Sequence, residues 1–320
     1  METRADTVSR IDIQAAQGRI APHIRKTPVM EIAGSEVGHD APVSLKLELF
    51  QHTGSFKPRG AFNNLLSKPV PPAGVAAASG GNHGAAVAYA AARLGHRANI
   101  FVPEISSPVK IARIEAAGAN VHVGGARYAD ALANCESHQA ATGAIGVHAY
   151  DDPATIAGQG SLALEWQEQV PGLDTVLISV GGAGLISGIA AWYGGTVKVV
   201  GVEPEGAPTL HAALAAGGPV DVEINSLAAD SLGARSVGKI NHALCAHHVD
   251  HVALVSDEAI RNALAFLWTG LQIAAEPGGA TAMAALLTGA YRPQPGERVG
   301  VLVCGGNIDP ATLVAHTASS

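Results

Sequence analysis

The sequence predicts an α/β protein built on parallel sheets. Short runs rich in Val and Ile alternate with Ala-rich stretches of helical length along most of the 320 residues. The 38 glycines exceed what helix interiors accommodate, which indicates many tight turns between those elements. Aromatic residues make up only 4% of the chain, so Ala, Val, Ile and Leu must fill the cores.

The expected elements alternate in chain order. The expected strands are residues 43–49, 74–79, 97–103, 119–125, 174–180, 197–204, 250–256 and 298–304. The expected helices are residues 61–68, 81–95, 107–118, 126–143, 181–194, 257–276 and 278–290. Residues 74–148 contain a complete βαβα pattern of their own. We therefore predict a small α/β domain at 74–148, inserted between residues 1–73 and 149–320 of a larger domain.

Charge and cysteine content exclude several classes of protein. The net charge of −7 argues against a nucleic-acid binder, which usually presents a basic face. No apolar run approaches the ~18 residues that span a bilayer, and the charged N-terminus lacks a signal core. Three cysteines, Cys135, Cys245 and Cys304, are odd in number and far apart, which favours a reducing compartment. We expect a cytoplasmic protein without nucleic-acid or membrane partners.

Four turns follow expected strands at the edge where parallel sheets bind ligands. They are residues 79–84, 179–185, 202–209 and 303–307. The "GGAGL" turn at 181–185 opens a helix, and its glycine N–H groups together with the helix N-terminus favour an anion, most often phosphate. A tight turn that binds nothing is the alternative.

A dinucleotide site explains part of this pattern. Gly182 and Gly184 match the first two glycines of G-x-G-x-x-G, and Ser187 stands where the third belongs. Glu203 follows about 20 residues later, where the acid that binds ribose is expected. That alternative, a NAD-dependent oxidoreductase, leaves Lys57 and the 79–84 turn unexplained.

Pyridoxal phosphate explains more of the pattern with one ligand. It needs a phosphate cradle, a lysine that forms a Schiff base with the aldehyde, and a group opposite the pyridine nitrogen. The 181–185 loop, Lys57 and Cys304 can supply these three groups. Lys57 itself lies in an unusual place for a lysine, next to Phe56 and between turn residues.

Six motifs in order then resemble one family. They are "HTGSFKPRGAFNNL", "SGGNHG", "GGAGL", "VEPEGAP", "EPGGA" and "VCGGN". This order and spacing resembles the serine/threonine dehydratases and serine racemases, which are fold type II pyridoxal-phosphate enzymes, over residues 12–310. The resemblance implies two open, twisted, mostly parallel sheets flanked by helices, as in tryptophan synthase β, with the large domain binding the cofactor.

The resemblance also implies roles for individual residues. Lys57 matches the Schiff-base lysine, Phe56 the aromatic residue against the cofactor ring, and Asn82 the asparagine bonded to the ring hydroxyl. The turn that binds the substrate carboxylate matches Ser79, Gly81, Asn82 and His83. The phosphate loop matches Gly181, Gly182, Ala183, Gly184 and Leu185.

Two of these positions decide details of the chemistry. The family usually has glycine where Ala183 stands, and a methyl group fits there if φ is negative. Cys304 matches the residue that faces the pyridine nitrogen, although a buried apolar role is the common one for cysteine. A thiol leaves the ring neutral, unlike a carboxylate, and this favours expulsion of a leaving group from the β carbon.

The implied reaction is α,β-elimination of water from an amino acid. Freed Lys57 removes the α proton, the β-hydroxyl leaves as water protonated by the cofactor phosphate, and hydrolysis gives a 2-keto acid and ammonia. We expect an ammonia-lyase acting on L-serine, L-threonine or a related 3-hydroxy amino acid, in amino-acid degradation. A dehydratase for 3-phenylserine or 3-hydroxyaspartate, and a serine racemase, remain alternatives.

Departures from the family pattern refine this expectation. Racemases have serine where Gly80 stands, so we expect little racemase activity. Glu203 and Ala207 match two ligands of a divalent ion, but Thr209 replaces the third, an aspartate. This set predicts a K⁺-type site, with a plain surface loop as the alternative. Ser231 stands where biosynthetic threonine dehydratases usually have glycine, which leaves the substrate side of the pocket open.

The remaining expectations concern assembly and two weaker motifs. The chain ends soon after "CGGNIDP", which leaves no room for a regulatory domain, and the family resemblance implies a homodimer. "CAHHVDH" at 245–251 is expected to be a histidine-rich edge rather than a zinc site. Ser107 and Lys110 form S-x-x-K without the K-T-G partner motif, so we expect the first turn of a helix.

Overall fold

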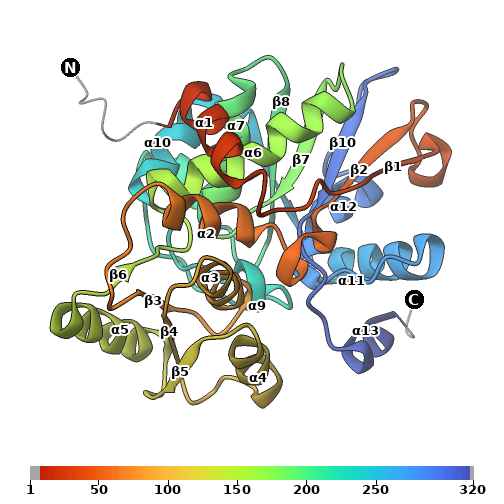
Figure 1. Ribbon diagram of the computed structural model, residues 1–320. Coiled ribbons are helices and arrows are strands. Elements are labelled where there is room, and N and C mark those ends of the chain that lie inside the picture. The colour runs from red at the N-terminus through yellow and green to blue at the C-terminus, as the bar shows by residue number, and fades with distance from the viewer. Residues whose placement is uncertain (1–7, 318–320) are drawn as a thin grey trace.

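The computed structural model describes residues 8–317, and these form two sheets flanked by helices (Figure 1). The larger sheet has the strand order β1 (Val29–Ile32), β2 (Val43–Leu47), β10 (Val299–Val303), β7 (Thr175–Ser179), β8 (Lys198–Pro204) and β9 (His251–Val255). The smaller sheet has the order β5 (Asn120–Val123), β4 (Ala98–Val102), β3 (Val75–Ala78) and β6 (Ile145–Gly146). The pairing of β1 with β2 is antiparallel, and the other strand pairings are parallel.

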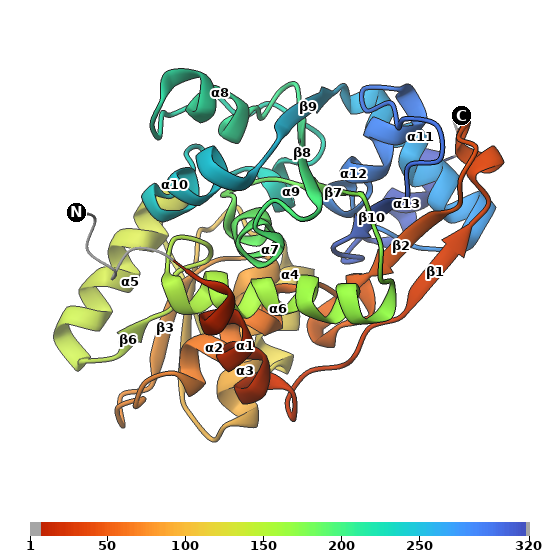
Figure 2. The same cartoon turned by 90° about the horizontal axis from the view of Figure 1, so that it is seen from above.

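Strand β7 shows how the large sheet is buried on both faces. Val176 and Ile178 pack in the core that includes α6 (Pro153–Gln169) and α7 (Gly184–Tyr193). Leu177 between them points to the opposite face, in the core that includes α11 (Asp257–Ala265) and α12 (Pro277–Thr288). Successive side chains of a strand alternate between faces, so a strand covered on both sides needs a continuous apolar run. Figure 2 shows these helices on either side of the sheet.

The small sheet is covered in the same way. Val75 and Ile100 pack in the core with α2 (Lys57–Leu66) and α3 (Asn82–Arg93). Ala76 and Phe101 face the other way, toward α5 (Tyr128–Thr142). All four strands of this sheet lie between residues 75 and 146.

The expected strands are all present, and the helices differ at particular places. Helix α2 begins at Lys57 rather than at residue 61, and the helix expected over 257–276 ends at Ala265, followed by a π-helical turn, Phe266–Gly270. The backbone then turns at Gln272, whose φ is +58°. The other elements are α1 (Arg10–Ile20), α4 (Pro108–Ala116), α8 (Thr209–Ala216), α9 (Ala229–Leu232), α10 (Lys239–His248), α13 (Pro310–Thr317) and 3₁₀ turns Gly34–Val37, Glu48–Phe50 and His52–Gly54.

Helix α6 was not expected from the sequence, because its glycines weaken the helical pattern. Those glycines allow close packing with two neighbouring helices. A Cβ at Gly158 would lie 2.5 Å from the Arg59 carbonyl oxygen of α2, and a Cβ at Gly188 of α7 would lie 2.6 Å from the backbone nitrogen of Gly160. Close backbone approach is a role that only glycine fills. Helix α6 therefore fixes α2, whose first residue is Lys57, against α7.

A buried ion network holds the same region together. Arg59 donates to Glu48 Oε1 at 2.7 Å from Nη2 and to Glu48 Oε2 at 2.9 Å from Nε. Its Nη2 also lies 2.9 Å from Oε2 of Glu165, and Lys46 Nζ lies 2.5 Å from Oε1 of that residue. Burial alone raises a carboxyl pKa, but Arg59 and Lys46 hold the pKa of Glu165 below its usual value. The network ties α2 and α6 to strand β2 and the turn after it.

No helix among residues 8–317 is long and apolar enough to cross a membrane.

Candidate active site

Lys57 lies at the carboxyl end of strand β10. The segment before it pairs with the residues that follow β10, through a Ser55–Gly305 bridge and a hydrogen bond of 3.1 Å from Phe56 N to Cys304 O. Helix α2 then starts at Lys57 with Pro58 in its first turn, where the missing proline N–H is not needed. The sequence thus places Lys57 at the edge of the sheet where parallel strands bind ligands.

The Lys57 amine is largely enclosed by apolar and neutral groups. Its Nζ donates to the Ala149 carbonyl oxygen at 3.2 Å and lies 5.0 Å from the centre of the Phe56 ring. Burial lowers the pKa of Lys57 to about 8, although Cys304 and Glu276 oppose the shift. A substantial fraction of this amine is therefore neutral near pH 8, and only the neutral amine is a nucleophile or a base.

One cavity joins Lys57 to the glycine loop. Its wall includes the residues predicted to bind the cofactor, Phe56, Lys57, Asn82, Gly181, Gly182, Ala183, Gly184, Leu185 and Cys304. Further lining residues, which the sequence analysis did not single out for the cofactor, are Tyr150, Ser179, Val180, Ile186, Ser231, Leu232 and Glu276. Residues from positions 56 to 304 of the chain therefore meet in one place.

The loop between β7 and α7 has the features of a phosphate cradle. A Cβ at Gly182 would lie 2.4 Å from the Tyr150 ring, so a side chain there would displace that ring. Asn241 Nδ2 fixes the loop by donating to the carbonyl oxygens of Gly182, at 3.0 Å, and Tyr150, at 3.1 Å. The N-cap residue of α7, Ala183, makes no side-chain capping bond. An uncapped helix N-terminus lining a cavity favours a bound anion.

Ala183 adopts a left-handed backbone conformation, with φ 67° and ψ 1°. The condition under which a methyl group was expected to fit here, a negative φ, is therefore not met. An L-residue with a Cβ in this region is strained by roughly 1–2 kcal/mol. The strain is accepted at a loop that surrounding contacts hold in place.

We expect Ala183→Gly to raise the free energy of unfolding by about 1 kcal/mol, because glycine adopts this conformation without strain. Urea denaturation of the cofactor-free protein measures the change. Ala190→Gly, in the interior of α7, is the matched control and should lower stability by about 1 kcal/mol. Equal destabilisation by both substitutions would show that strain at Ala183 is negligible.

Cys304 is a neutral group on the wall of the same cavity. It is 3% exposed, and its Sγ lies 3.5 Å from the carbonyl oxygen of Gly278. Burial raises the pKa of the Cys304 thiol well above its usual value, with Glu276 acting in the same direction. The side chain is therefore a thiol at neutral pH and cannot hold a proton on a facing ring nitrogen as a carboxylate can.

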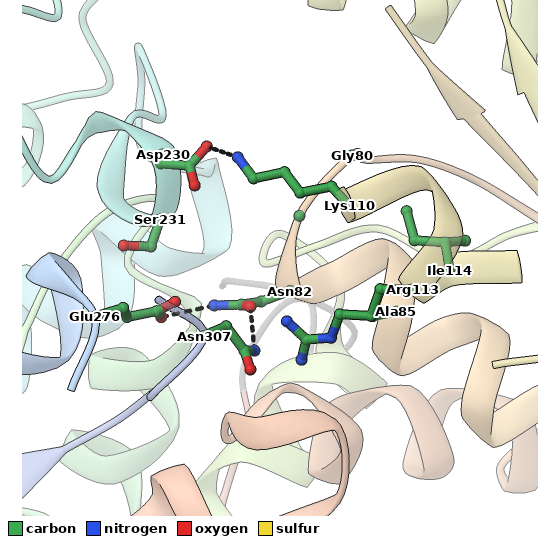
Figure 3. Close-up of a pocket in the computed structure, with 11 residues that line it drawn as sticks. Gly80, Asn82, Ala85, Lys110, Arg113, Ile114, Asp230, Ser231, Glu276 and Asn307 are labelled. Carbon is green, nitrogen blue, oxygen red and sulfur yellow. Dashed lines mark hydrogen bonds and ion pairs between the residues drawn. The ribbon is translucent and has the colours of Figure 1, made fainter. Parts of the chain in front are cut away.

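Asn82 belongs to a chain of hydrogen bonds that the sequence did not reveal (Figure 3). Its Nδ2 donates to Glu276 Oε1 at 2.7 Å, and its Oδ1 accepts from Asn307 Nδ2 at 2.6 Å. Burial raises the pKa of Glu276 to about 7, although the bond from Asn82 opposes the shift. Glu276 stands in "EPGGA" and Asn307 ends "VCGGN", so the signal was present in motifs whose polar residues had no assigned role.

The depressed pKa of Lys57 predicts how loading with cofactor depends on pH. We expect the rate of covalent loading of the cofactor-free protein to rise with pH through about 8, as the Lys57 amine loses its proton. The Glu276 carboxylate raises that pKa, so Glu276→Gln should move the midpoint to lower pH. Borohydride trapping at timed intervals measures the rate. An unmoved midpoint would show that Glu276 does not act on Lys57.

The predicted carboxylate turn is present, but only two of its four residues line a cavity. Gly81 and Asn82 line a second cavity next to the first. Ser79 Oγ accepts from the Gly81 N–H at 3.3 Å, and His83 Nε2 lies 2.8 Å from the Val147 carbonyl oxygen. Burial lowers the pKa of His83 to about 3, so the ring is neutral and donates this bond. The side chains of Ser79 and His83 hold the turn in place. They are not among the described residues that line the two cavities.

The predicted cation ligands lie together where β8 leads into α8. Glu203 is completely buried, and its carboxylate accepts the backbone N–H groups of Leu210 at 2.7 Å and His211 at 2.9 Å. Thr209 Oγ1 lies 3.5 Å from the Ala207 carbonyl oxygen and donates to the Ala234 carbonyl oxygen at 2.9 Å. One carboxylate and several neutral oxygens are thus close to one another.

The residues of the two weaker motifs make structural contacts. Ser107 is the N-cap of α4, and Lys110 forms an ion pair with Asp230. Cys245 is buried with its Sγ 3.3 Å from Ser187 Oγ. Between residues 8 and 317, no group of three or more His, Cys, Asp or Glu side chains is arranged to hold a metal.

Groups on the wall of the cavity match the chemical groups of pyridoxal phosphate. The 181–185 loop suits a phosphate, and the amine of Lys57, which can lose its proton, suits an aldehyde. The thiol of Cys304 suits an unprotonated ring nitrogen. The residues fit this cofactor, and the two mostly parallel sheets around them define a fold type II pyridoxal-phosphate enzyme.

Comparison with known proteins agrees with this class. The chain belongs to the family of pyridoxal-phosphate dependent enzymes, which matches residues 20–305. It is 38% identical to a phenylserine dehydratase of Ralstonia pickettii, covering 98% of each chain. It is 35% identical to an L-threonine ammonia-lyase of Geobacter sulfurreducens, over 94% of this chain and 76% of that one. Maize serine racemase superposes with a TM-score of 0.91 at 33% identity, covering 98% of both chains.

These comparisons confirm the predicted family, the predicted fold and the predicted enzyme class, an ammonia-lyase of the dehydratase type. They give no support to the dinucleotide alternative, because the family match includes both Lys57 and the glycine loop.

Proposed function

We propose that this chain removes water from L-serine, L-threonine or a related 3-hydroxy amino acid and gives a 2-keto acid and ammonia. The observation that supports this most is the placement of Lys57 and the neutral Cys304 thiol on one cavity with the glycine loop. The names of the relatives, a phenylserine dehydratase and an L-threonine ammonia-lyase, point to the same chemistry.

The residues have separate roles in this proposal. Bound pyridoxal phosphate supplies an electron sink for the α carbon. Lys57 would hold the cofactor covalently, and its Nζ would take the α proton of the substrate. Phe56 and Asn82 would orient the ring, and the 181–185 loop would hold the phosphate. We propose that residues 8–73 and 149–317 form the cofactor-binding domain and that residues 74–148 form the domain that supplies the carboxylate turn.

A panel of 3-hydroxy amino acids tests the proposal. Cofactor-loaded protein is incubated with L-serine, L-threonine or L-3-phenylserine, and the keto acid and ammonia released are measured. The two products are expected in equal amounts. Keto acid from at least one of them is expected. Loaded protein that releases neither keto acid nor ammonia from any 3-hydroxy amino acid would contradict the proposed function.

We expect little D-serine from L-serine, because Gly80 has no side chain that could carry a proton to the second face of the α carbon. A Cβ at this position would meet Ser106 Oγ at 2.8 Å, the end of a side chain that can rotate away. Gly80→Ser should therefore fold normally and increase D-serine formation. Chiral chromatography of the product measures it, and abundant D-serine from the unaltered protein would contradict this expectation.

The proposal extends to a monovalent cation, a homodimer and a cytoplasmic location. Glu203, Ala207 and Thr209 would hold K⁺, since one carboxylate with neutral oxygens suits a large, weakly charged ion better than Mg²⁺. Activity and melting temperature in K⁺ and in tetraethylammonium test the site, and equal values would count against it. Light scattering tests the dimer, and three free cysteines fit a reducing compartment.

A further inference from the structure

A second cavity adjoins the one that contains Lys57 (Figure 3). Its wall is formed by Gly80, Gly81, Asn82, Ala85, Lys110, Arg113, Ile114, Asp230, Ser231, Glu276 and Asn307. Asn82, Ser231 and Glu276 also line the Lys57 cavity, so the two spaces share a boundary. Because the predicted carboxylate turn forms part of this wall, a substrate held by that turn would lie against the second cavity.

Two cationic side chains of helix α4, Lys110 and Arg113, line this cavity and have different partners. Lys110 forms an ion pair with Asp230, and Figure 3 shows it reaching toward the opposite wall. Arg113 points inward, toward Asn82 and Asn307. Its guanidinium donates to the Thr53 carbonyl oxygen, and no carboxylate among residues 8–317 lies within ion-pair distance of it.

Arg113 therefore has N–H donors without a hydrogen-bond acceptor and a positive charge without a directly paired carboxylate in the described part of the chain. A guanidinium carries five N–H donors and binds a carboxylate in a two-pronged geometry. Burial lowers the pKa of Arg113, although the nearby Glu276 carboxylate opposes the shift. An anion in the cavity would supply the missing partner.

The other residues of the wall indicate which kind of substrate side chain the cavity fits. Apolar lining comes from Ala85 and Ile114, and Asn82, Asn307 and Ser231 add hydrogen-bonding groups. Two carboxylates also line the cavity, but Asp230 is paired with Lys110, and Glu276 accepts a hydrogen bond from Asn82. A phenyl substituent needs an apolar enclosure, and an anionic substituent needs a cation and polar neighbours. The wall has the second character.

We propose that Arg113 determines specificity by binding a second carboxylate on the β carbon of the substrate. This rests on the proposed function and names its substrate class, a 3-hydroxy amino acid with two carboxylates. Elimination removes the α proton and the β-hydroxyl as water, and hydrolysis returns one water. The net products are a 2-oxo dicarboxylic acid and ammonia.

The test compares substrates on the loaded enzyme. The probe is 3-hydroxyaspartate, as separate L-threo and L-erythro isomers, against L-serine and L-threonine. We expect kcat/KM for one isomer to exceed that for L-threonine. Arg113→Met should lower kcat/KM for that isomer about 10- to 100-fold, mainly through KM, and change L-serine less than about threefold, as expected for loss of one charged hydrogen-bonded pair. Arg113→Lys should restore part of the loss.

Arg261→Met is the matched control, because Arg261 is a surface arginine that pairs with Glu258 and lines neither cavity, and it should change the ratio between the substrates little. A fall by the same factor for all substrates in Arg113→Met would mean that Arg113 only supports the Thr53 segment, and the proposal would be wrong. Turnover of L-serine, L-threonine or 3-phenylserine without turnover of 3-hydroxyaspartate would also overturn it and leave the proposed function intact. No turnover of any substrate would instead contradict the proposed function.

Discussion

Replacing Lys57 with alanine is expected to lower keto-acid formation at least about 10³-fold, because the variant loses both the covalent anchor and the base. Lys57 is the single lysine among the residues that line the cavity, so no neighbour there can form the covalent anchor. The Cys304 thiol on the same wall has a pKa that burial raises far above neutrality, and Glu276 accepts a hydrogen bond from Asn82. Steady-state keto-acid release with excess added cofactor measures the loss.

Lys68→Ala is the control for this prediction, since Lys68 is an exposed lysine just beyond the end of α2. It should keep full activity. The melting temperature of the cofactor-free Lys57→Ala protein should match or exceed that of the unaltered protein, because burying the amine lowers its pKa and is therefore unfavourable for the charged form. Activity of the alanine variant within tenfold of the unaltered protein would remove Lys57 from the mechanism.

Arg59→Met is expected to lower the free energy of unfolding by about 3–5 kcal/mol, the effect of removing one partner from a buried ion network. Arg59 has no exposed surface and touches two carboxylates, Glu48 and Glu165. The substitution would leave Glu48 without its cationic partner, whereas Glu165 would keep Lys46. Urea denaturation of the cofactor-free protein measures the change.

Arg261→Met is the matched control for that change. Arg261 pairs with Glu258 on the surface, with side chains 41% and 70% exposed, and surface pairs contribute at most about 1 kcal/mol. Because α2 begins at Lys57, Arg59→Met should also weaken retention of the cofactor. Equal effects of the two substitutions would show that the buried network contributes no more than a surface pair.

Much of the fold was accessible from sequence because strands buried on both faces are continuous apolar runs. The runs that became β7, β8 and β10 were of this kind. The glycine loop and Lys57 were accessible because phosphate and amine chemistry need particular residue types. Helix α6 was missed since Gly158 and Gly160, which weaken a helical pattern, serve contacts with other helices that the sequence does not show.

The rest of the site depends on contacts between distant residues. Glu276 and Asn307 meet Asn82 across about 200 residues of chain, and Arg113 reaches the same region from α4. None of these pairings has a local spacing that a pattern could detect. The positive φ of Ala183 is likewise set by the loop's surroundings, including Asn241 and Tyr150, rather than by its own sequence.

The most direct test of the central claim, that Lys57 holds the cofactor, is to locate the covalent bond. The protein is loaded with pyridoxal phosphate, reduced with borohydride, cleaved with trypsin and analysed by mass spectrometry. We expect one reduced cofactor on the fragment of residues 47–59, which runs from after Lys46 to Arg59 and contains Lys57 as its single lysine. A cofactor attached to another lysine, or no attachment in a protein that binds the cofactor, would contradict it.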